Sequence, residues 1–336
     1  MNAGKLIYWF NELGQEDDEL VGKKCANLGE LTRAGFQVPP GFALSLEAYK
    51  RFLTDTGAIE EIRRYFAAFD ADPGNPKDLP KFQEASRIVR GFVESKAMPE
   101  TMECTVAQYY DELCQKTGIK DVPVATRSAG TASHPGQYET YLHVRGKPDV
   151  MKNIIKVWSS TFNPRSLITR ARKGLQLDYD PIGVAVLKMV NAKAAGIMFT
   201  AEPITGESSK IVIEGSWGLG ESVVSGGVNP DSWVVDKDKF EIIERRLSIK
   251  LVEHVFDPVT GKVSKVDIAA DRQGIPCLTD EELVEIARTG RSIEQHCRLP
   301  QDIEWAIDSD LPANNNIVML QTRPEKFNIE LRFAGF

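Results

Sequence analysis

The sequence has no apolar stretch long enough to cross a membrane. Its apolar runs, such as residues 184–187 and 211–213, fall far short of the roughly 20 residues that a membrane-spanning helix needs. The N-terminus has a few apolar residues followed by acids, which does not fit a secretory signal. We therefore expect neither a membrane span nor an exported protein.

Cysteine is scarce, and its spacing is uninformative. The chain has 5 cysteines, an odd number, and none of them forms a C-x-x-C pair. Neither a disulfide framework nor a zinc site follows from such a pattern. The simplest setting for these thiols is the reducing cytoplasm.

Basic residues are fewer than acidic residues. The chain has 41 Lys and Arg against 48 Asp and Glu, which gives a net charge of −7 at pH 7. An acidic surface repels a phosphodiester backbone, so we expect no nucleic acid partner. ATP is not excluded, because a nucleotide site needs only a local cluster of positive groups.

Composition and length predict a globular protein with two domains. Hydrophobic residues make up 42% of the chain and charged residues 26%, which excludes disordered and fibrous classes. At 336 residues the chain is too long for one small core. We expect an N-terminal lobe over residues 1–190 and a C-terminal lobe over residues 191–330.

The pattern of short periodic segments predicts an α+β protein with a helical first third and sheet-rich lobes after it. Helices are expected over residues 26–34, 46–53, 81–94, 99–116 and 150–173, the last interrupted at Asn163-Pro164. Strands are expected over residues 122–126, 183–190, 196–200, 210–214, 232–236, 240–250, 302–308 and 316–323. Thr279 and Glu282 have the spacing of a capping box, which predicts a helix that continues to about Cys297.

The last two strands carry the most informative chemistry. Alternation along residues 302–308 places Asp302 and Glu304 on one face and apolar side chains on the other. Gln321 and Arg323 share a face of the following strand. If the two strands pair, a carboxylate, an amide oxygen and a guanidinium converge, which suits Mg²⁺ and a polyphosphate. A hairpin with a solvated polar face is the alternative.

Two further segments are weaker signals. Residues 214–221 are rich in glycine, which lets a backbone approach a ligand or another strand closely. They match neither the P-loop pattern nor the dinucleotide pattern, and a tight structural bend is an equal alternative. Lys24 precedes a predicted helix and could help the helix dipole to hold an anion, although a solvated lysine is commoner.

Eight segments in this order resemble the nucleotide-binding domain of the dikinase phosphotransferases. The segments are GKKCANLGEL, VPPGFALS, VATRSAGT, GQYETYLHVRG, AGIMFT, GSWGLGESVVSGGVNPD, QDIEWAID and MLQTRP. The family includes phosphoenolpyruvate synthase, pyruvate phosphate dikinase and rifampicin phosphotransferase, and the resemblance covers nearly the whole chain. It implies an ATP-grasp-like fold that binds ATP between two α+β lobes.

The resemblance also implies roles for individual residues. The phosphate contacts would come from Lys24 and Arg127. Gly136, Thr140 and Tyr141 would belong to the loop and strand that close over the nucleotide. The Mg²⁺ ligands would be Glu304 and Gln321, and Arg323 would stabilise charge on the transferring phosphoryl group. Catalysis by Arg323, Arg127 and Lys24 would then consist of positioning and electrostatics.

The sequence departs from the family pattern at two positions. The loop SAGTASHPGQ is shorter than the family's usual connection, so the segment over the phosphates is expected to differ. Leu187 stands where many relatives place a glutamine near the adenine, which leaves base selectivity open.

Complete dikinases carry a phosphorylated histidine, typically in a T-S-H context. None of the four histidines here, His134, His143, His254 and His296, has that context. We interpret His134 as a hydrogen-bonding bystander. The phosphohistidine and the acceptor-binding domain are therefore expected on a partner subunit. A free-standing ATP lobe is similar to the smaller subunit of phenylphosphate synthases, which implies phenol as the final acceptor.

The leading hypothesis is an ATP-binding subunit that passes the β-phosphoryl group of ATP to a histidine of its partner, with AMP and phosphate as products. A phosphoenolpyruvate synthase-like subunit that acts on pyruvate is one alternative. A non-catalytic nucleotide sensor is another, and it would keep Lys24 and Arg127 without needing the metal hairpin. An ATP-grasp ligase would form ADP instead of AMP.

Overall fold

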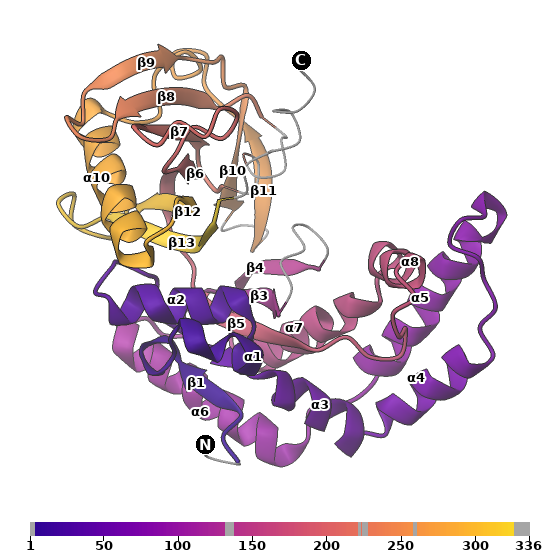
Figure 1. Cartoon of the computed structure of the whole chain (residues 1–336). Helices are drawn as coiled ribbons and strands as arrows, with labels where there is room; N and C mark the ends of the chain where they lie inside the picture. Colours follow the sequence, from indigo (N-terminus) through magenta and orange to yellow (C-terminus); the bar gives the residue numbers. More distant parts are fainter. Residues whose placement is uncertain (1–3, 132–137, 221–222, 224–227, 258–260, 326–336) are drawn as a thin grey trace. The chain divides into compact units, whose positions relative to one another are not determined.

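The computed structural model describes residues 4–131, 138–220, 223, 228–257 and 261–325 (Figure 1). The chain divides into two compact units. The first unit comprises Met1–Arg33 and Pro40–Met189, and the second comprises Ala34–Pro39 and Val190–Phe336. The short segment Ala34–Pro39 thus belongs to the second unit although the first unit lies on both sides of it in sequence.

The first unit contains most of the helices. Its helices are α1 (Asp18–Val21), α2 (Lys23–Arg33), α3 (Leu46–Asp55), α4 (Ala58–Ala67), α5 (Leu79–Glu94), α6 (Glu100–Thr117), α7 (Lys147–Ser159) and α8 (Pro164–Arg172). Its strands are β1 (Ile7–Trp9), β2 (Gly41–Leu44), β3 (Val124–Gly130), β4 (Thr140–Val144) and β5 (Ile182–Lys188). Short 3-10 turns occupy Phe10–Glu12, Gln15–Asp17, Pro76–Asp78 and Ser160–Phe162.

These strands form a sheet in the order β1-β2-β5-β3-β4, in which every neighbouring pair is antiparallel. One face carries Val184 and Val186 and packs on helices that include α7. α1 and α2 reach the opposite face, where the backbones come very close. A Cβ at Gly22 would overlap the carbonyl of Ala129, and Gly22 has a φ of +82°, so only glycine fits there.

The core of the first unit is aromatic where its helices meet. The rings of Tyr49 and Trp158 stack with centroids 5.5 Å apart. The buried Tyr49 hydroxyl donates to the carbonyl oxygen of Trp158 at 3.1 Å and also contacts Thr161 Oγ1 at 3.0 Å. The helix α3 begins at Ser45, whose side chain accepts from the amide of Ala48, as the sequence predicts.

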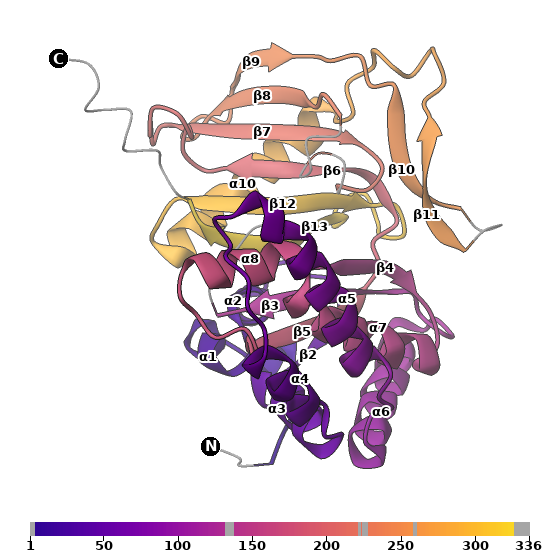
Figure 2. The same cartoon turned by 90° about the vertical axis from the view of Figure 1, so that its right-hand side faces the viewer.

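The second unit is mainly sheet. Its strands are β6 (Ala192–Phe199), β7 (Lys210–Trp217), β8 (Asp231–Asp236), β9 (Ile242–Arg246), β10 (Val252–Asp257), β11 (Lys262–Asp267), β12 (Gln301–Asp308) and β13 (Ile317–Pro324). Six of them form an antiparallel sheet in the order β13-β12-β6-β7-β8-β9, which Figure 2 shows strand by strand. β10 and β11 form a separate hairpin. Helix α10 (Asp280–Cys297) lies against the large sheet and contacts β7 and β12 (Figure 1).

The predicted α+β class, helical first and sheet-rich afterwards, is confirmed. The predicted helices are all present, and the break at Asn163-Pro164 separates α7 from α8. The strand predicted to end at residue 126 continues to Gly130, because β5 pairs with it along its whole length. Strands β1, β2, β4, β10 and β11 were not predicted by periodicity. No helix in the described part of the chain has the length and hydropathy of a membrane span.

The capping box predicted for α10 is present and can be tested. Thr279 Oγ1 accepts from the amide of Glu282 at 3.2 Å, and Glu282 Oε2 accepts from the amide of Thr279 at 2.9 Å. Thr279→Ala is expected to lower the free energy of unfolding of the second unit by about 1 kcal/mol. Hydrogen exchange of the first turn of α10 would measure the loss. Thr279→Ser keeps the acceptor and should preserve protection; equal exchange in the two variants would contradict the prediction.

Candidate functional site in the terminal hairpin

Strands β12 and β13 pair as the alternation of their residues predicts. Glu304 lies directly opposite Gln321, and Asp302 lies directly opposite Arg323. Directly opposite residues share a face and have Cβ atoms about 5 Å apart. The carboxylate, the amide and the guanidinium therefore lie on one face of the sheet within two register rows.

The Glu304–Gln321 pair fits a divalent cation. Gln321 is buried, and its side-chain oxygen Oε1 has no hydrogen-bond partner among the described residues. A buried acceptor without a donor calls for an explanation, and a bound ion is one. Mg²⁺ prefers oxygen ligands and usually takes only one or two from the protein, because water and substrate phosphates supply the others. No cluster of three or more His, Cys, Asp or Glu that could hold a metal occurs among the described residues. The residues present thus suit a metal shared with a phosphate.

Asp302 holds the guanidinium of Arg323. Its Oδ2 accepts from Arg323 Nε at 2.7 Å, and Arg323 Nη2 lies 2.5 Å from the same oxygen. The Asp302 side chain is 13% exposed and that of Arg323 is 36% exposed, so the acid is the anchored partner. Burial raises the pKa of Asp302, the nearby Arg323 opposes that rise, and Glu304 adds to it. The ion pair fixes the guanidinium next to Glu304 and Gln321, whose side-chain oxygens are the candidate metal ligands.

A third carboxylate lies on the same face. Glu304 pairs with Ile197 of β6, and Ile197 pairs with Glu214 of β7. Glu214 therefore shares the face at a distance of two strands, or about 10 Å. Burial raises its pKa. This face of the second unit therefore carries three carboxylates, those of Asp302, Glu304 and Glu214.

In the first unit, the charges of Lys24 and Arg127 act on the same buried thiol, that of Cys25. Lys24 lies in the first turn of α2, and Arg127 lies on β3, on the face that α1 and α2 reach. Burial raises the pKa of Cys25 to about 12, and the positive charges of both Lys24 and Arg127 oppose that rise. Two cations, at the start of a helix and on the adjacent strand, suit an anion such as a phosphate.

The two predicted residues of β4 lie on opposite faces. Thr140 pairs with Arg127 and shares its face, whereas Tyr141 pairs with Thr126 and faces the helices. Lys156 of α7 lies 5.5 Å from the centroid of the Tyr141 ring, and the Tyr141 hydroxyl donates to Glu139. Thr140 is thus placed beside a proposed phosphate ligand, and Tyr141 is held by the first unit's helical side.

Glu139 anchors the start of β4. Arg90 donates to both of its carboxylate oxygens, at 2.6 Å and 2.9 Å, and the Glu139 amide donates to Ser160 Oγ at 3.1 Å. Gly136 and His134, which the sequence places in the phosphate loop, lie outside the described residues. Leu187 is buried on β5.

Comparison with known proteins assigns the chain to a family. Residues 18–332 match the family described as pyruvate phosphate dikinase, AMP/ATP-binding domain. The chain belongs to this family.

Relatives of this AMP/ATP-binding domain include phosphoenolpyruvate synthases of archaea. The chain is 36% identical to phosphoenolpyruvate synthase of Pyrococcus furiosus over 360 residues, which cover 96% of the chain and 44% of that protein. It is 36% identical to the enzyme of the same name from Aeropyrum pernix over 352 residues, which cover 96% of the chain and 42% of that protein. A probable phosphoenolpyruvate synthase of Methanocaldococcus jannaschii is 36% identical over 326 residues, 95% of the chain and 26% of that protein. The chain thus spans less than half the length of these three relatives.

Two carboxylates of this AMP/ATP-binding domain are additions to the predicted site. The sequence places Asp302 on the correct face, two residues from Glu304, but does not show that it binds Arg323. Glu214 stands at the head of the glycine-rich segment, and its position follows only from the order of β12, β6 and β7.

Two glycines of the same segment, Gly215 and Gly218, serve packing. A Cβ at Gly215 would come within 2.9 Å of the buried Trp305 ring, and one at Gly218 would lie 2.5 Å from the carbonyl oxygen of His254. Gly218 also has a φ of +74°. The structural alternative given for this segment accounts for both positions.

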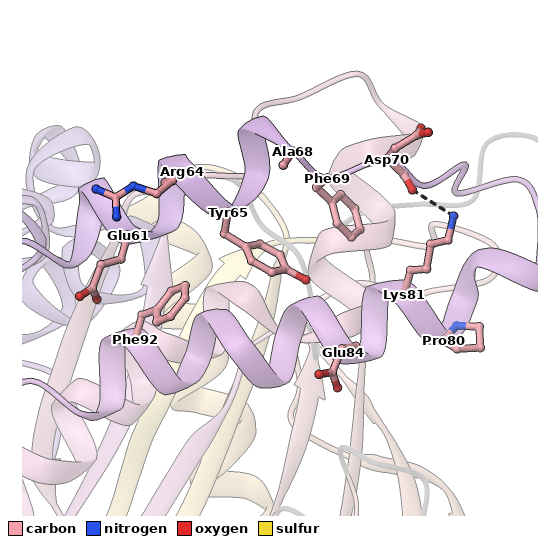
Figure 3. A pocket seen from close by; sticks show the side chains of 10 residues that line it. All are labelled: Glu61, Arg64, Tyr65, Ala68, Phe69, Asp70, Pro80, Lys81, Glu84 and Phe92. Atoms are coloured by element: carbon pink, nitrogen blue, oxygen red, sulfur yellow. Dashed lines mark hydrogen bonds between the residues drawn. The ribbon is translucent and has the colours of Figure 1, made fainter.

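A groove elsewhere in the AMP/ATP-binding domain lies apart from the residues predicted for the site. It lies between α4 and α5, has a volume of about 960 Å³, and is lined by none of the predicted site residues (Figure 3). Tyr65, Phe69 and Phe92 supply its aromatic lining, and Lys81 Nζ donates across it to the carbonyl oxygen of Asp70 at 3.1 Å.

The site assignment therefore rests on the terminal hairpin and on the Lys24–Arg127 region, each within its own unit.

Proposed function

We propose that this chain is the ATP-binding part of a dikinase-type phosphotransferase. In this reaction the β-phosphoryl group of ATP passes to a ring nitrogen of a histidine on a partner subunit, water takes the γ-phosphoryl group, and AMP and phosphate leave. The observation that carries the proposal is the pair of Glu304 and Gln321 next to the anchored Arg323, with a buried Gln321 oxygen that has no partner in the described part of the chain. Family membership supports ATP as the nucleotide.

Each residue has a role that its surroundings support. Glu304 and Gln321 would hold Mg²⁺, which when bound neutralises charge on the phosphate oxygens. Arg323 donates hydrogen bonds to the phosphoryl group during its transfer, and Asp302 keeps the Arg323 guanidinium oriented. Lys24 and Arg127 bind phosphate oxygens, and the start of α2 adds its positive dipole end. Thr140, across from Arg127, supplies a hydroxyl donor to the same phosphates.

The proposal for the final acceptor rests on the names of the relatives. The relatives are named phosphoenolpyruvate synthases, which favours pyruvate as the acceptor of the second phosphoryl transfer. Phenol, implied by the resemblance to phenylphosphate synthases, is the alternative. Both require the same first half-reaction, so the ATP site serves either one.

Isotope labelling of the native complex tests the proposal. With ATP labelled in the β-phosphoryl group, we expect label on the partner polypeptide in an acid-labile, base-stable form, and with γ-labelled ATP we expect labelled phosphate. Addition of pyruvate or of phenol should discharge the labelled partner, and the one that does so is the acceptor. Accumulation of ADP would instead support the ligase, and binding of ATP without any turnover would support the nucleotide sensor.

The metal role of the hairpin gives a separate prediction. Glu304→Gln and Gln321→Ala should each raise the Mg²⁺ concentration needed for half-maximal AMP formation by at least about tenfold, because the first removes the negative charge of a ligand and the second removes an oxygen ligand. A Mg²⁺ titration of AMP formation by the native complex measures this. Glu281→Gln, at an exposed position of α10, is the matched control and should leave the midpoint unchanged. Equal midpoints for Glu304→Gln and Glu281→Gln would remove Glu304 from the metal site.

A further inference from the structure

Strand β4 carries Thr140 at the margin of its sheet, where backbone pairing is limited. β4 ends the strand order of the five-stranded sheet, which leaves β3 as its ladder partner among the described strands. The register shifts between Val124 and Thr126 of β3, and His143, in the opposing part of β4, has a φ of +59°. An irregular edge strand has fewer backbone bonds to fix its position than a central strand has. Side-chain contacts are therefore needed to hold Thr140 in place.

A closed ring of hydrogen bonds joins the start of β4 to two helices. Arg90 of α5 donates to both carboxylate oxygens of Glu139, at 2.6 Å and 2.9 Å, and to Glu94 Oε1 at 3.2 Å. Glu94 Oε1 also accepts from Ser159 Oγ at 2.6 Å. The Glu139 amide donates to the hydroxyl oxygen of the next residue, Ser160, at 3.1 Å. The ring thus runs from β4 to α5, to the end of α7, and back to β4.

Burial and charge hold this ring in one arrangement. Ser159 and Ser160 are fully buried, and the Arg90 side chain is 24% exposed. Burial raises the pKa of Glu139, but the hydrogen bonds from Arg90 and Tyr141 outweigh burial and leave that pKa below its usual value. The carboxylate is therefore ionised at neutral pH. A bidentate pair between a carboxylate and a guanidinium has a defined geometry, so the pair fixes the side chain of Glu139.

Thr140 lies between two residues that both belong to this network. Glu139 precedes it, and Tyr141, which follows it, donates its hydroxyl to the Glu139 carboxylate. Because side chains alternate along a strand, Glu139 and Tyr141 point to the helical side, whereas Thr140 points to the face of Arg127. A change at Glu139 would therefore act on Thr140 through the backbone, and would remove no group from the face of Arg127.

We propose that Glu139 is a positioning residue for ATP binding. Through its pair with Arg90 it fixes the start of β4, so that the Thr140 hydroxyl donates to the phosphate that Arg127 binds. A donor that is already oriented before the ligand arrives costs less entropy when the complex forms. This inference rests on the proposed function for the role of Thr140, and it extends that function to a residue on the opposite face of the strand.

A double-mutant cycle in the full chain, read by calorimetry of ATP binding, tests the proposal. Thr140→Val removes the hydroxyl and should raise the Kd for ATP about tenfold, the loss of one hydrogen bond to a charged group. Glu139→Ala should raise it by a similar factor, and Glu139→Gln, which keeps an acceptor for Arg90, by less. The double variant Glu139→Ala with Thr140→Val should lie within about twofold of Thr140→Val, because Glu139 acts through that hydroxyl. A general loss of structure would instead add to the effect of Thr140→Val.

Glu84→Ala is the matched control. Glu84 also accepts twice from an arginine of α5, Arg87, at 2.9 Å and 2.5 Å, but its side chain is 52% exposed, and its loss should leave the Kd unchanged. The proposal is overturned if Thr140→Val or Glu139→Ala binds ATP as tightly as Glu84→Ala, or if the two effects multiply in the double variant. A chain that binds ATP while its native complex forms no AMP contradicts the proposed function alone, because these binding measurements need no turnover.

Discussion

The variant Arg323→Ala is expected to form AMP about 10³- to 10⁵-fold more slowly than the unaltered complex. Phosphoryl transfer involves little covalent chemistry from the protein, so the loss of a positioned guanidinium removes a large share of the transition-state stabilisation. Binding of ATP should change far less, because Lys24, Arg127 and the metal ligands are retained. Rapid-quench measurement of AMP and equilibrium binding of ATP together separate the two effects.

Two variants serve as controls for Arg323→Ala. Arg291→Ala removes another ion-paired arginine of the same unit, which contacts Asp238 at 3.1 Å, and should leave AMP formation unchanged. Asp302→Asn keeps a hydrogen-bond acceptor for Arg323 and should therefore cost less than the loss of the guanidinium itself. If Arg323→Ala and Arg291→Ala turn over ATP equally fast, Arg323 has no role in transfer. Thermal unfolding of each variant shows whether a loss of rate follows from a loss of structure.

The terminal hairpin shows which parts of the site can be predicted from the alternation of residues along a strand. Period-two alternation alone assigns Glu304 and Gln321 to polar faces, and the antiparallel register then makes them direct partners. The antiparallel pairing could be anticipated because the two strands are adjacent in sequence, whereas their register comes from the structure. The ion pair between Asp302 and Arg323 could not be ranked above others, because a sequence does not show which of several acids on a face is buried.

Features that depend on contacts between segments far apart in the sequence could not be predicted. β2 follows two prolines and is only four residues long, and it is stabilised by pairing with β5, which lies about 140 residues later. The position of Glu214 on the same face as Glu304, two strands away, likewise depends on β6 lying between their strands. The assignment of Ala34–Pro39 to the second unit comes from contacts such as the bond from the amide of Met319 to the carbonyl oxygen of Gln37 at 2.8 Å. No local periodicity encodes these contacts.

Lys250→Met is expected to lower the free energy of unfolding of the second unit by about 3–5 kcal/mol. The substitution leaves the fully buried carboxylate of Asp231 without its cation, and an uncompensated buried charge is costly. Asp231 also accepts from the amides of Ser248 and Cys277, so its displacement would disturb both neighbouring segments. Because the chain has two units, hydrogen exchange of peptides that span residues 231–252 is a better measure than a single global transition.

Two comparisons identify the origin of that loss. Lys239→Met removes an exposed lysine from the turn after β8 and should cost no more than about 0.5 kcal/mol. In the double variant Asp231→Asn with Lys250→Met, the buried charge is gone while the asparagine oxygen can still accept from Ser248, so protection should partly return. If Lys250→Met were as stable as Lys239→Met, the pair would contribute nothing to the unit. If it were unstable and the double variant equally so, the cost would come from the lost hydrogen bond of Lys250 to the carbonyl oxygen of Ser248, because removing the carboxylate charge would then relieve nothing.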